Sequence, residues 1–428
     1  MGREGNRIPV PFSGLPIGGE PWGPDVPSDP ALSSLLMGLD ALIFGGGIAG
    51  LWTLDELRRA GFAAALLEAG ALGAGQTVCS QGIIHGGVKY TLSGLLHPAA
   101  EAIREMPGLW RSCLRGEVEP NLSRARVRAE SCHMWRTDSL RSRAGMLGAK
   151  VGLRVAPVTV EDDERPAALR ACPGTVARLD EQVIDPASVL AVLAERNRGL
   201  VGRALPERVS IARAGPGWRV SVGRESGGAV EIEAKTLVFA AGRGNEALRR
   251  AVGLDAAAMQ VRPLHMAMAR GSTLPELNGH CADGARTRIT ITTDADSHGR
   301  RVWQIGGQLA EDGVKLSETE LVAHAKREVG ACLPGVDLRD VEWSTYRADR
   351  AELAQRSGVR PDDATMLVEN GVITLWPTKL ALAPRGAAMV SEALTRLGAP
   401  SGPAPGVPGL EAPPVELPPW EGAREWLS

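Results

Sequence analysis

The sequence has no excess of either charge, no long apolar run and no closely paired cysteines. The 48 Lys and Arg nearly balance the 50 Asp and Glu in the 428 residues, so we expect neither nucleic acid nor an anionic membrane as a partner. No stretch reaches the about 18 apolar residues that a membrane span needs. Residues 1–30 lack the apolar core of a signal peptide. These absences predict a cytoplasmic protein without a membrane span.

Several catalytic and metal-binding motifs are also missing. None of the six cysteines belongs to a CxxC pair, which argues against a zinc knuckle or a thioredoxin-like site and favours reduced, buried thiols. HExxH, GxSxG and Walker A sequences do not occur, so the common metalloprotease, serine hydrolase and NTPase classes are not indicated. We therefore expect no metal site.

Proline is concentrated at the two ends of the chain. Residues 1–36 and 399–428 are rich in Pro, and such segments do not form regular helices or central strands. Met37 directly precedes the first expected strand and offers an alternative translation start. The long middle part has enough residues for two or three domains with their own cores.

The middle part begins with a β-α-β pattern. Residues 41–44 form a short apolar run, typical of a buried parallel strand. Leu51, Leu54 and Leu57 then recur at helical spacing, and residues 63–67 form a second apolar run. This order predicts two neighbouring parallel strands joined by one helix.

A glycine-rich turn joins the first strand to the helix and fits the pattern GxGxxG. The first glycine permits a tight turn, the second lets the backbone approach a pyrophosphate, and the third lets the helix pack close to the strand. The start of the helix then offers unpaired N–H groups and its positive dipole end to the phosphates. We expect cofactor contacts along this turn, at Gly45, Gly47, Ile48, Ala49 and Gly50.

An acidic residue, Glu68, ends the second strand. A carboxylate at this place accepts hydrogen bonds from ribose hydroxyls and would repel the 2′-phosphate of NADP. The turn and Glu68 together predict a dinucleotide site. By themselves they leave FAD and NAD open, and an NAD-dependent dehydrogenase is one alternative.

Three later segments favour FAD over NAD, because they resemble segments of a known family. Residues 73–90 (GAGQTVCSQGIIHGGVKY), 237–245 (LVFAAGRGN) and 376–384 (WPTKLALAP) resemble segments of the FAD-dependent oxidoreductases of the D-amino-acid oxidase and glycerol-3-phosphate dehydrogenase group. The IHGG stretch is also similar to L-2-hydroxyglutarate oxidase. The resemblance covers about residues 38–396. It implies further cofactor contacts at Gln76, Thr77, Ser80, Ala241, Gly242, Thr378, Lys379 and Leu380.

Two details of these segments depart from the family. Trp-Pro-Thr at 376–378 replaces the usual glycines, which gives that turn less backbone freedom. Cys79 and Ser80 stand where some members carry a flavin-linked histidine, and His85 lies several residues beyond. The resemblance therefore implies FAD that is bound non-covalently.

The resemblance also implies a site for a small, anionic substrate. Arg347 matches the family's anion-binding arginine, whose planar fork suits a carboxylate or phosphate. The alternative is that Arg347 forms a surface ion pair with Asp349 or Glu352 and does not bind substrate. Lys379 or Arg350 would be the next candidate anchor.

His85 is the best candidate general base, followed by His265 and Tyr90, whereas no motif surrounds His97, His133, His280, His298 and His324.

These observations predict an α/β protein. It would have a Rossmann-type FAD-binding domain with a parallel sheet and a second, α+β substrate domain with a mixed or antiparallel sheet. The expected reaction is hydride transfer from a 2-hydroxy acid, an amino acid or a polyol phosphate to flavin, with oxygen, a quinone or a protein as electron acceptor. A non-catalytic flavin-binding subunit of a larger complex is another alternative. The expected FAD-binding domain is residues 37–95, 181–258 and 351–398, and the substrate domain residues 96–180 and 259–350.

Overall fold

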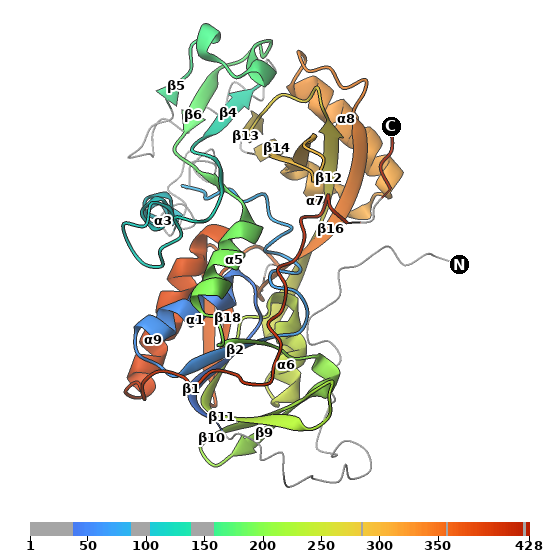
Figure 1. Ribbon diagram of the computed structural model, residues 1–428. Coiled ribbons are helices and arrows are strands. Elements are labelled where there is room, and N and C mark those ends of the chain that lie inside the picture. Colours follow the sequence, from blue (N-terminus) through green and yellow to red (C-terminus); the bar gives the residue numbers. More distant parts are fainter. Residues whose placement is uncertain (1–36, 87–102, 138–157, 284–285, 357, 423–424) are drawn as a thin grey trace, which may run out of the picture.

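The computed structural model describes residues 37–86, 103–137, 158–283, 286–356, 358–422 and 425–428. Two large sheets lie at opposite ends of the molecule, and the long strands β12 and β16 of the second sheet extend toward the first (Figure 1). Residues 1–36, expected as a tail, lie outside the described part.

The first sheet has a parallel core. Its main strand order is β17-β18-β11-β1-β2-β8, and each neighbouring pair from β18 to β8 is parallel. Antiparallel strands extend it at β17 and on β11. The strands are β1 (Met37–Phe44), β2 (Ala64–Glu68), β8 (Val201–Arg203), β9 (Val209–Ala214), β10 (Gly217–Gly223), β11 (Ala229–Phe239), β17 (Thr365–Glu369) and β18 (Val372–Trp376).

Apolar side chains cover both faces of this sheet. On β1, Ala41 and Ile43 belong to one hydrophobic cluster, while Leu42 and Phe44 belong to the cluster on the other face. Helices α1 (Ile48–Arg59), α5 (Pro186–Arg196) and α9 (Ala383–Leu397) gather on the first of these faces (Figure 1). Burial on both faces explains why residues 41–44 of β1 are all apolar rather than alternating.

The second sheet is mixed and mostly antiparallel. Its order is β16-β12-β15-β14-β13-β4-β6-β5, with one parallel pair, β13 and β4. Helix α8 (Glu318–Cys332) covers it and begins with a capping box between Ser317 and Glu320. The strands are β4 (Cys132–Arg136), β5 (Val158–Thr159), β6 (Val176–Leu179), β12 (Met259–Gly271), β13 (Gly279–Asp283), β14 (Arg286–Ala295), β15 (Arg301–Gly306) and β16 (Glu342–Leu353).

Short elements connect the two sheets. Strands β3 (Val127–Ala129) and β7 (Val183–Ile184) form a small two-stranded sheet. The remaining α-helices of the described residues are α3 (Met106–Leu114), α6 (Asn245–Ala251) and α7 (Gln308–Asp312). The predicted α/β class, with a parallel sheet and a second mixed sheet, is confirmed. Strand β11 begins at Ala229, well before the predicted Leu237, because it also pairs with β10. The exact domain boundaries remain a proposal.

The C-terminal segment 399–428 packs along the body instead of projecting from it. In Figure 1 it runs from the first sheet to the second. Its backbone bonds to Leu72 beside the first sheet, and Leu427 exchanges two hydrogen bonds with Trp343 of β16. Trp420 is 3% exposed and packs in a cluster with Cys79 and Tyr346. This segment therefore ties the two sheets together.

Replacing Trp420 by alanine should loosen this connection. A buried Trp→Ala change costs roughly 3–5 kcal/mol, and partial release of the segment limits the loss to the lower part of that range. We expect a lower melting temperature in a thermal scan. Leu417→Ala is the matched control, because Leu417 is 63% exposed. Equal melting temperatures for the two variants would show that the segment contributes nothing to stability.

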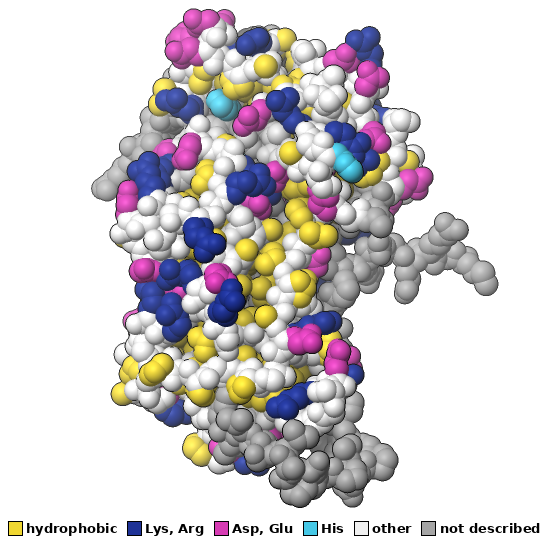
Figure 2. Space-filling view, viewed as in Figure 1, with side chains coloured by type: hydrophobic (Ala, Val, Ile, Leu, Met, Phe, Trp, Pro, Cys, Tyr) yellow, Lys and Arg dark blue, Asp and Glu magenta, His cyan; other side chains and the backbone are white. Residues whose placement is uncertain are grey.

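The cysteines agree with the prediction of buried, reduced thiols, and the surface carries charges of both signs. Basic and acidic side chains are interspersed over the face seen in Figure 2. All six cysteines lie in the described part, are buried and form no disulfide. Among the described residues, no helix combines the length and apolar character that a membrane crossing requires.

Candidate functional site

The glycine turn after β1 is dictated by close backbone contacts. Gly45 has φ 110°, and a Cβ there would lie 2.5 Å from the Cα of Ala241 at the end of β11. A Cβ on Gly50 would lie 1.8 Å from the carbonyl oxygen of Gly45. At Gly47 the nearest atom to such a Cβ is the Thr77 Oγ1, 3.1 Å away. Gly45 and Gly50 are thus required by packing, whereas Gly47 leaves space in front of the helix.

Helix α1 presents its N-terminus to this space. Its N-cap, Gly47, has no side chain, and among the described residues the one side chain that accepts from its first turn is Thr77, whose Oγ1 lies 3.2 Å from the backbone nitrogen of Ile48. The turn lies at the carboxyl ends of the adjacent parallel strands β1 and β11, where open α/β sheets bind ligands. An anionic group such as a pyrophosphate is favoured at this place.

Glu68 is buried beside the same turn. Its carboxylate accepts hydrogen bonds from the N–H groups of Gly46 and Gly70, and its exposed fraction is 4%. Burial raises the pKa of Glu68, although these amides oppose the shift. The side chain is therefore fixed as an acceptor at the end of β2.

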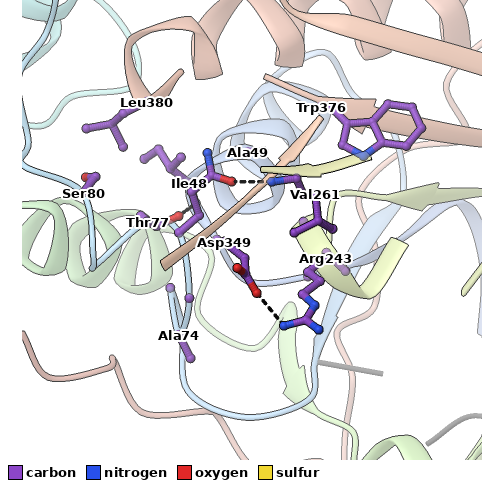
Figure 3. A pocket seen from close by; sticks show the side chains of 18 of the residues that line it. Ile48, Ala49, Ala74, Thr77, Ser80, Arg243, Val261, Asp349, Trp376 and Leu380 are labelled. Carbon is purple, nitrogen blue, oxygen red and sulfur yellow. Dashed lines mark hydrogen bonds and ion pairs between the residues drawn. The ribbon is translucent and has the colours of Figure 1, made fainter. Parts of the chain in front are cut away.

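A large cavity extends from this turn toward the second sheet. Its volume is about 1060 Å³, above the roughly 300–1,000 Å³ of most small-molecule sites. Ile48, Ala49, Thr77 and Ser80 stand on one side, with Trp376 and the ion pair of Arg243 and Asp349 opposite (Figure 3). The cavity has room for a dinucleotide and a small second molecule.

Thirteen of the predicted site residues line this cavity. The structure brings them together from β2, β16, the start of α1 and the turns that follow β1, β2, β11 and β18. They are Gly45, Gly47, Ile48, Ala49, Glu68, Gln76, Thr77, Ser80, Ala241, Gly242, Arg347, Lys379 and Leu380. Gly50, Thr378 and His85 do not line it. Gly50 packs against Gly45 beneath the glycine turn, and Thr378 is buried behind the cavity wall.

Strands β12 and β16 contribute lining residues that the motifs did not identify. Val261 and Pro263 of β12 pair with Ala351 and Asp349 of β16, and all four line the cavity. Their spacing of two places them on one face of the sheet. Leu264, Val314, Ser317 and Glu318 close the far end. Only the alternation along two paired strands would have identified Val261 and Pro263, and the pairing is not visible in the sequence.

Arg347 reaches the far end of the cavity. Its Nη1 and Nη2 donate to the carbonyl oxygens of Val314 and Leu316, at 3.0 and 3.1 Å. The alternative ion pair with Asp349 or Glu352 is wrong, because those carboxylates pair with other arginines. Among the described residues no carboxylate forms an ion pair with Arg347. Its positive charge therefore faces the cavity, although two of its guanidinium nitrogens already donate hydrogen bonds to backbone carbonyls.

The turn after β18 adopts an unusual backbone conformation, although Trp-Pro-Thr restricts its freedom. Thr378 has φ 60°, a left-handed conformation that glycine adopts more readily. Its hydroxyl donates to the carbonyl oxygen of Asp363, and its own carbonyl accepts from Arg360. The Lys379 Nζ donates to the Asp362 carbonyl at 2.9 Å. These bonds hold the turn where the family has glycines.

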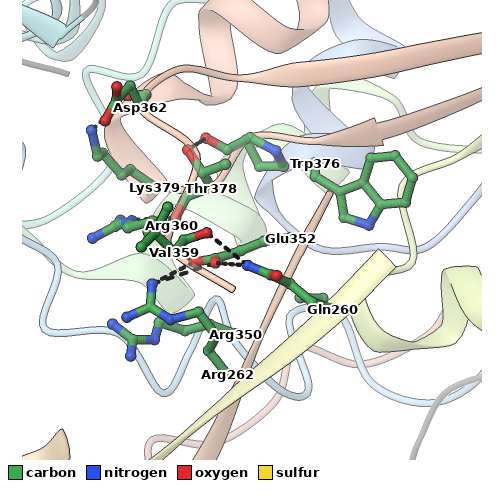
Figure 4. A network of polar contacts seen from close by, with 12 residues as sticks. Gln260, Arg262, Arg350, Glu352, Val359, Arg360, Asp362, Trp376, Thr378 and Lys379 are labelled. Atoms are coloured by element: carbon green, nitrogen blue, oxygen red, sulfur yellow. Dashed lines mark hydrogen bonds and ion pairs between the residues drawn. The ribbon is translucent and has the colours of Figure 1, made fainter. Parts of the chain in front are cut away.

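A polar network supports this turn from behind (Figure 4). The fully buried Glu352 contacts Arg262 and Gln260 at 3.4 Å and Arg360 at 3.8 Å. Burial and the neighbouring arginines lower the pKa of Arg350, which pairs with Glu311. The network fixes the ends of β12 and β16 next to the cavity.

The candidate bases differ in their surroundings. His265 is buried, with one ring nitrogen 3.1 Å from the Gly313 carbonyl and the other 3.0 Å from Thr345 Oγ1, so it is placed structurally. Burial lowers its pKa. His85 contacts Glu181 at 3.3 Å, outside the cavity lining. Tyr90 lies outside the described residues.

Two buried polar atoms of the cavity wall have no protein partner among the described residues. They are Ser80 Oγ and Trp376 Nε1. Buried polar groups are usually hydrogen-bonded, so these two atoms indicate a polar ligand at this place.

Comparison with known proteins gives one consistent picture. Residues 40–378 match the family model of FAD-dependent oxidoreductases related to D-amino-acid oxidase. A probable FAD-dependent oxidoreductase of Pseudomonas aeruginosa, PA4991, is 42% identical over 394 residues, or 90% of this chain and 98% of that protein. Its crystal structure superimposes with a TM-score of 0.76, at 39% identity and over the same shares of both chains.

More distant solved structures share the fold. Glycine oxidase from Geobacillus kaustophilus has a TM-score of 0.60 at 15% identity, over 86% of this chain and 96% of that one. The L-α-glycerophosphate oxidase of Mycoplasma pneumoniae, with FAD bound, has 0.59 at 14% identity, over 88% and 99%.

Proposed function

Because this chain belongs to the family of FAD-dependent oxidoreductases, we propose that it binds FAD non-covalently and oxidises a small anionic substrate at a C–N or C–OH bond. It is an enzyme of the FAD-dependent class, which removes the NAD-dependent alternative. The single observation that carries the substrate proposal is the cavity itself, which runs from the nucleotide turn to Arg347.

The residues of the cavity fit FAD. The space in front of Gly47 and the N–H groups at the start of α1 would take the pyrophosphate, and Glu68 would accept from a ribose hydroxyl. Ser80 Oγ and Trp376 Nε1, which stand on opposite sides of the cavity, would each gain a partner on the bound FAD. Lys379 would place positive charge near it. When bound, the flavin supplies the redox chemistry by accepting a hydride.

The far end of the cavity would hold the substrate. Arg347 would attract a carboxylate or phosphate, because it lines the cavity and no described carboxylate forms an ion pair with it. Val261, Pro263 and Leu264 would exclude water around the reacting carbon. Glycine oxidase and glycerophosphate oxidase share the fold but are named for different substrates. The proposal therefore covers amino acids, 2-hydroxy acids and polyol phosphates as one anionic class.

Anaerobic flavin bleaching tests this proposal. Purified protein with FAD would be mixed without oxygen with amino acids, 2-hydroxy acids and glycerol 3-phosphate, and with uncharged amines and alcohols as controls. We expect reduction by members of the anionic set alone. Reduction only by uncharged compounds would refute the proposal of an anionic substrate.

Readmitting oxygen, a quinone or a candidate protein to the reduced enzyme would then identify the electron acceptor. Release of FAD by heat or acid would establish non-covalent binding.

Glu68→Gln should weaken FAD binding. The amide keeps the size of the side chain but loses one acceptor and sets an N–H₂ group against the amides of Gly46 and Gly70. Losing a hydrogen bond to a charged group costs about 1.5–3 kcal/mol, or roughly ten- to a hundred-fold in affinity. FAD titration of the apoprotein measures the change, with the exposed Glu207→Gln as control. An unchanged dissociation constant would exclude Glu68 as a cofactor contact.

A further inference from the structure

Three potential metal ligands meet outside the cavity, from three separate parts of the chain. His85 follows Ile83, whose backbone pairs with Val183 of β7. Glu181 lies in the turn between β6 and β7, and His280 lies in β13 of the second sheet. One ligand atom from each of the three residues lies within 4.8 Å of the other two. No local motif indicates this group, because no two of its members are close along the chain.

The separations match a coordination shell better than hydrogen bonds. Glu181 Oε2 lies 3.3 Å from His85 Nδ1 and 3.5 Å from His280 Nε2. Charge-assisted N–H···O bonds are shorter, at about 2.7–2.9 Å. Ligands about 2.0–2.1 Å from a tetrahedral ion are separated from each other by roughly 3.3 Å. Two of the three separations therefore match the spacing that one small dication would impose, and the third, between the ligand nitrogens of the two histidines, is within 4.8 Å.

Burial adds a charge argument. Glu181 and His280 are each 1% exposed, and no described Arg or Lys forms an ion pair with Glu181. A buried carboxylate is costly unless a positive charge compensates it. A divalent ion shared with the two imidazoles would provide that charge. The His85 side chain is 16% exposed, which gives an ion a path from solvent.

Outer hydrogen bonds orient two of the ligands. His280 Nδ1 lies 2.9 Å from Thr290 Oγ1, so its Nε2 is left to face Glu181. Glu181 Oε1 accepts from the N–H of Gly86 at 2.8 Å, which leaves Oε2 toward both histidines. Metal-binding imidazoles and carboxylates are usually held in this way by a second set of partners.

We infer that His85, Glu181 and His280 form a binding site for a divalent transition-metal ion, with zinc as the best match. Two imidazoles and one carboxylate suit Zn²⁺ and also Co²⁺, Ni²⁺ and Fe²⁺, and three protein ligands leave a position for water or another oxygen ligand. The ion would tie the segment after Ile84 to β13 of the second sheet. His85 would then be a ligand rather than a general base.

Metal analysis of the full-length protein tests this site. Protein with its flavin, carrying no histidine tag and purified without chelator, would be analysed by mass spectrometry for metals. It would then be stripped with chelator and titrated calorimetrically with ZnCl₂. We expect one ion per chain. Co²⁺ would add ligand-field absorption at wavelengths beyond the flavin bands. Failure of the wild-type protein to bind Zn²⁺ or Co²⁺ would overturn the inference.

Variants separate this site from adventitious binding. His280→Ala and His85→Ala should weaken Zn²⁺ binding by at least about 100-fold, and Thr290→Val by about 10–100-fold through its outer hydrogen bond. The matched control is His298→Ala, because His298 is exposed. Thr290→Val keeps the ligands and the side-chain volume, so it tests the site even if a histidine variant fails to fold. Equal Zn²⁺ affinity in Thr290→Val and both histidine variants would show that the ion binds elsewhere.

Discussion

Replacing Gly47 by valine should abolish FAD binding while leaving the protein folded. The only described atom near a Cβ at this position is Thr77 Oγ1, at 3.1 Å, so the side chain would project into the space that the pyrophosphate needs. We expect the affinity for FAD to fall by at least about 100-fold, equivalent to more than about 2.7 kcal/mol. Flavin absorbance of the purified variant and titration with FAD measure it. Gly47→Ala should show a smaller loss.

Gly330→Ala is the control for this substitution. Gly330 lies inside α8, where a Cβ would meet nothing within 4 Å, so alanine there should leave FAD binding unchanged and slightly favour the helix. Circular dichroism of the Gly47→Val apoprotein would establish that it is folded. A folded Gly47→Val protein with full FAD occupancy would show that the pyrophosphate lies elsewhere.

Replacing Arg347 by alanine should impair substrate oxidation without loss of flavin. The guanidinium lines the far end of the cavity, away from the nucleotide turn, and no described carboxylate pairs with it. Losing a charge-assisted contact costs about 1.5–3 kcal/mol, so kcat/KM should fall roughly ten- to a hundred-fold. Arg347→Lys should also be impaired, because lysine keeps the charge but not the planar fork.

Flavin content and the kinetics of an uncharged substrate decide how the Arg347 result is interpreted. If Arg347 anchors an anion, the loss should be confined to anionic substrates. If both kinds of substrate are affected equally, or if the flavin is lost, the bonds to Val314 and Leu316 are the important ones and Arg347 is structural. Lys379, which also lines the cavity, would then be tested as the anchor.

The nucleotide half of the site could be predicted because its physics is local. Gly45, Gly47 and Gly50 lie within one strand-turn-helix unit that is recognised by its spacing; Gly50 packs against Gly45 of the same turn, whereas the close contact of Gly45 is with the distant Ala241. Asp185 and Pro186 likewise begin α5 at positions that these residue types favour, with the Asp185 carboxylate accepting from the N–H of Ala187. Neighbouring residues in the chain are enough to specify such features.

The substrate half depended on contacts that no local pattern contains. The pairing of β12 with β16 placed Val261 and Pro263 in the cavity wall, and the loop before α8 supplied the carbonyls that hold Arg347. The sequence by itself determined the α/β class, the nucleotide turn and the resemblance to FAD enzymes, since these rest on short-range sterics and periodicity. Only the tertiary structure decided which distant side chains meet, such as His85 with Glu181 and His280, because sheet register and strand order set those distances.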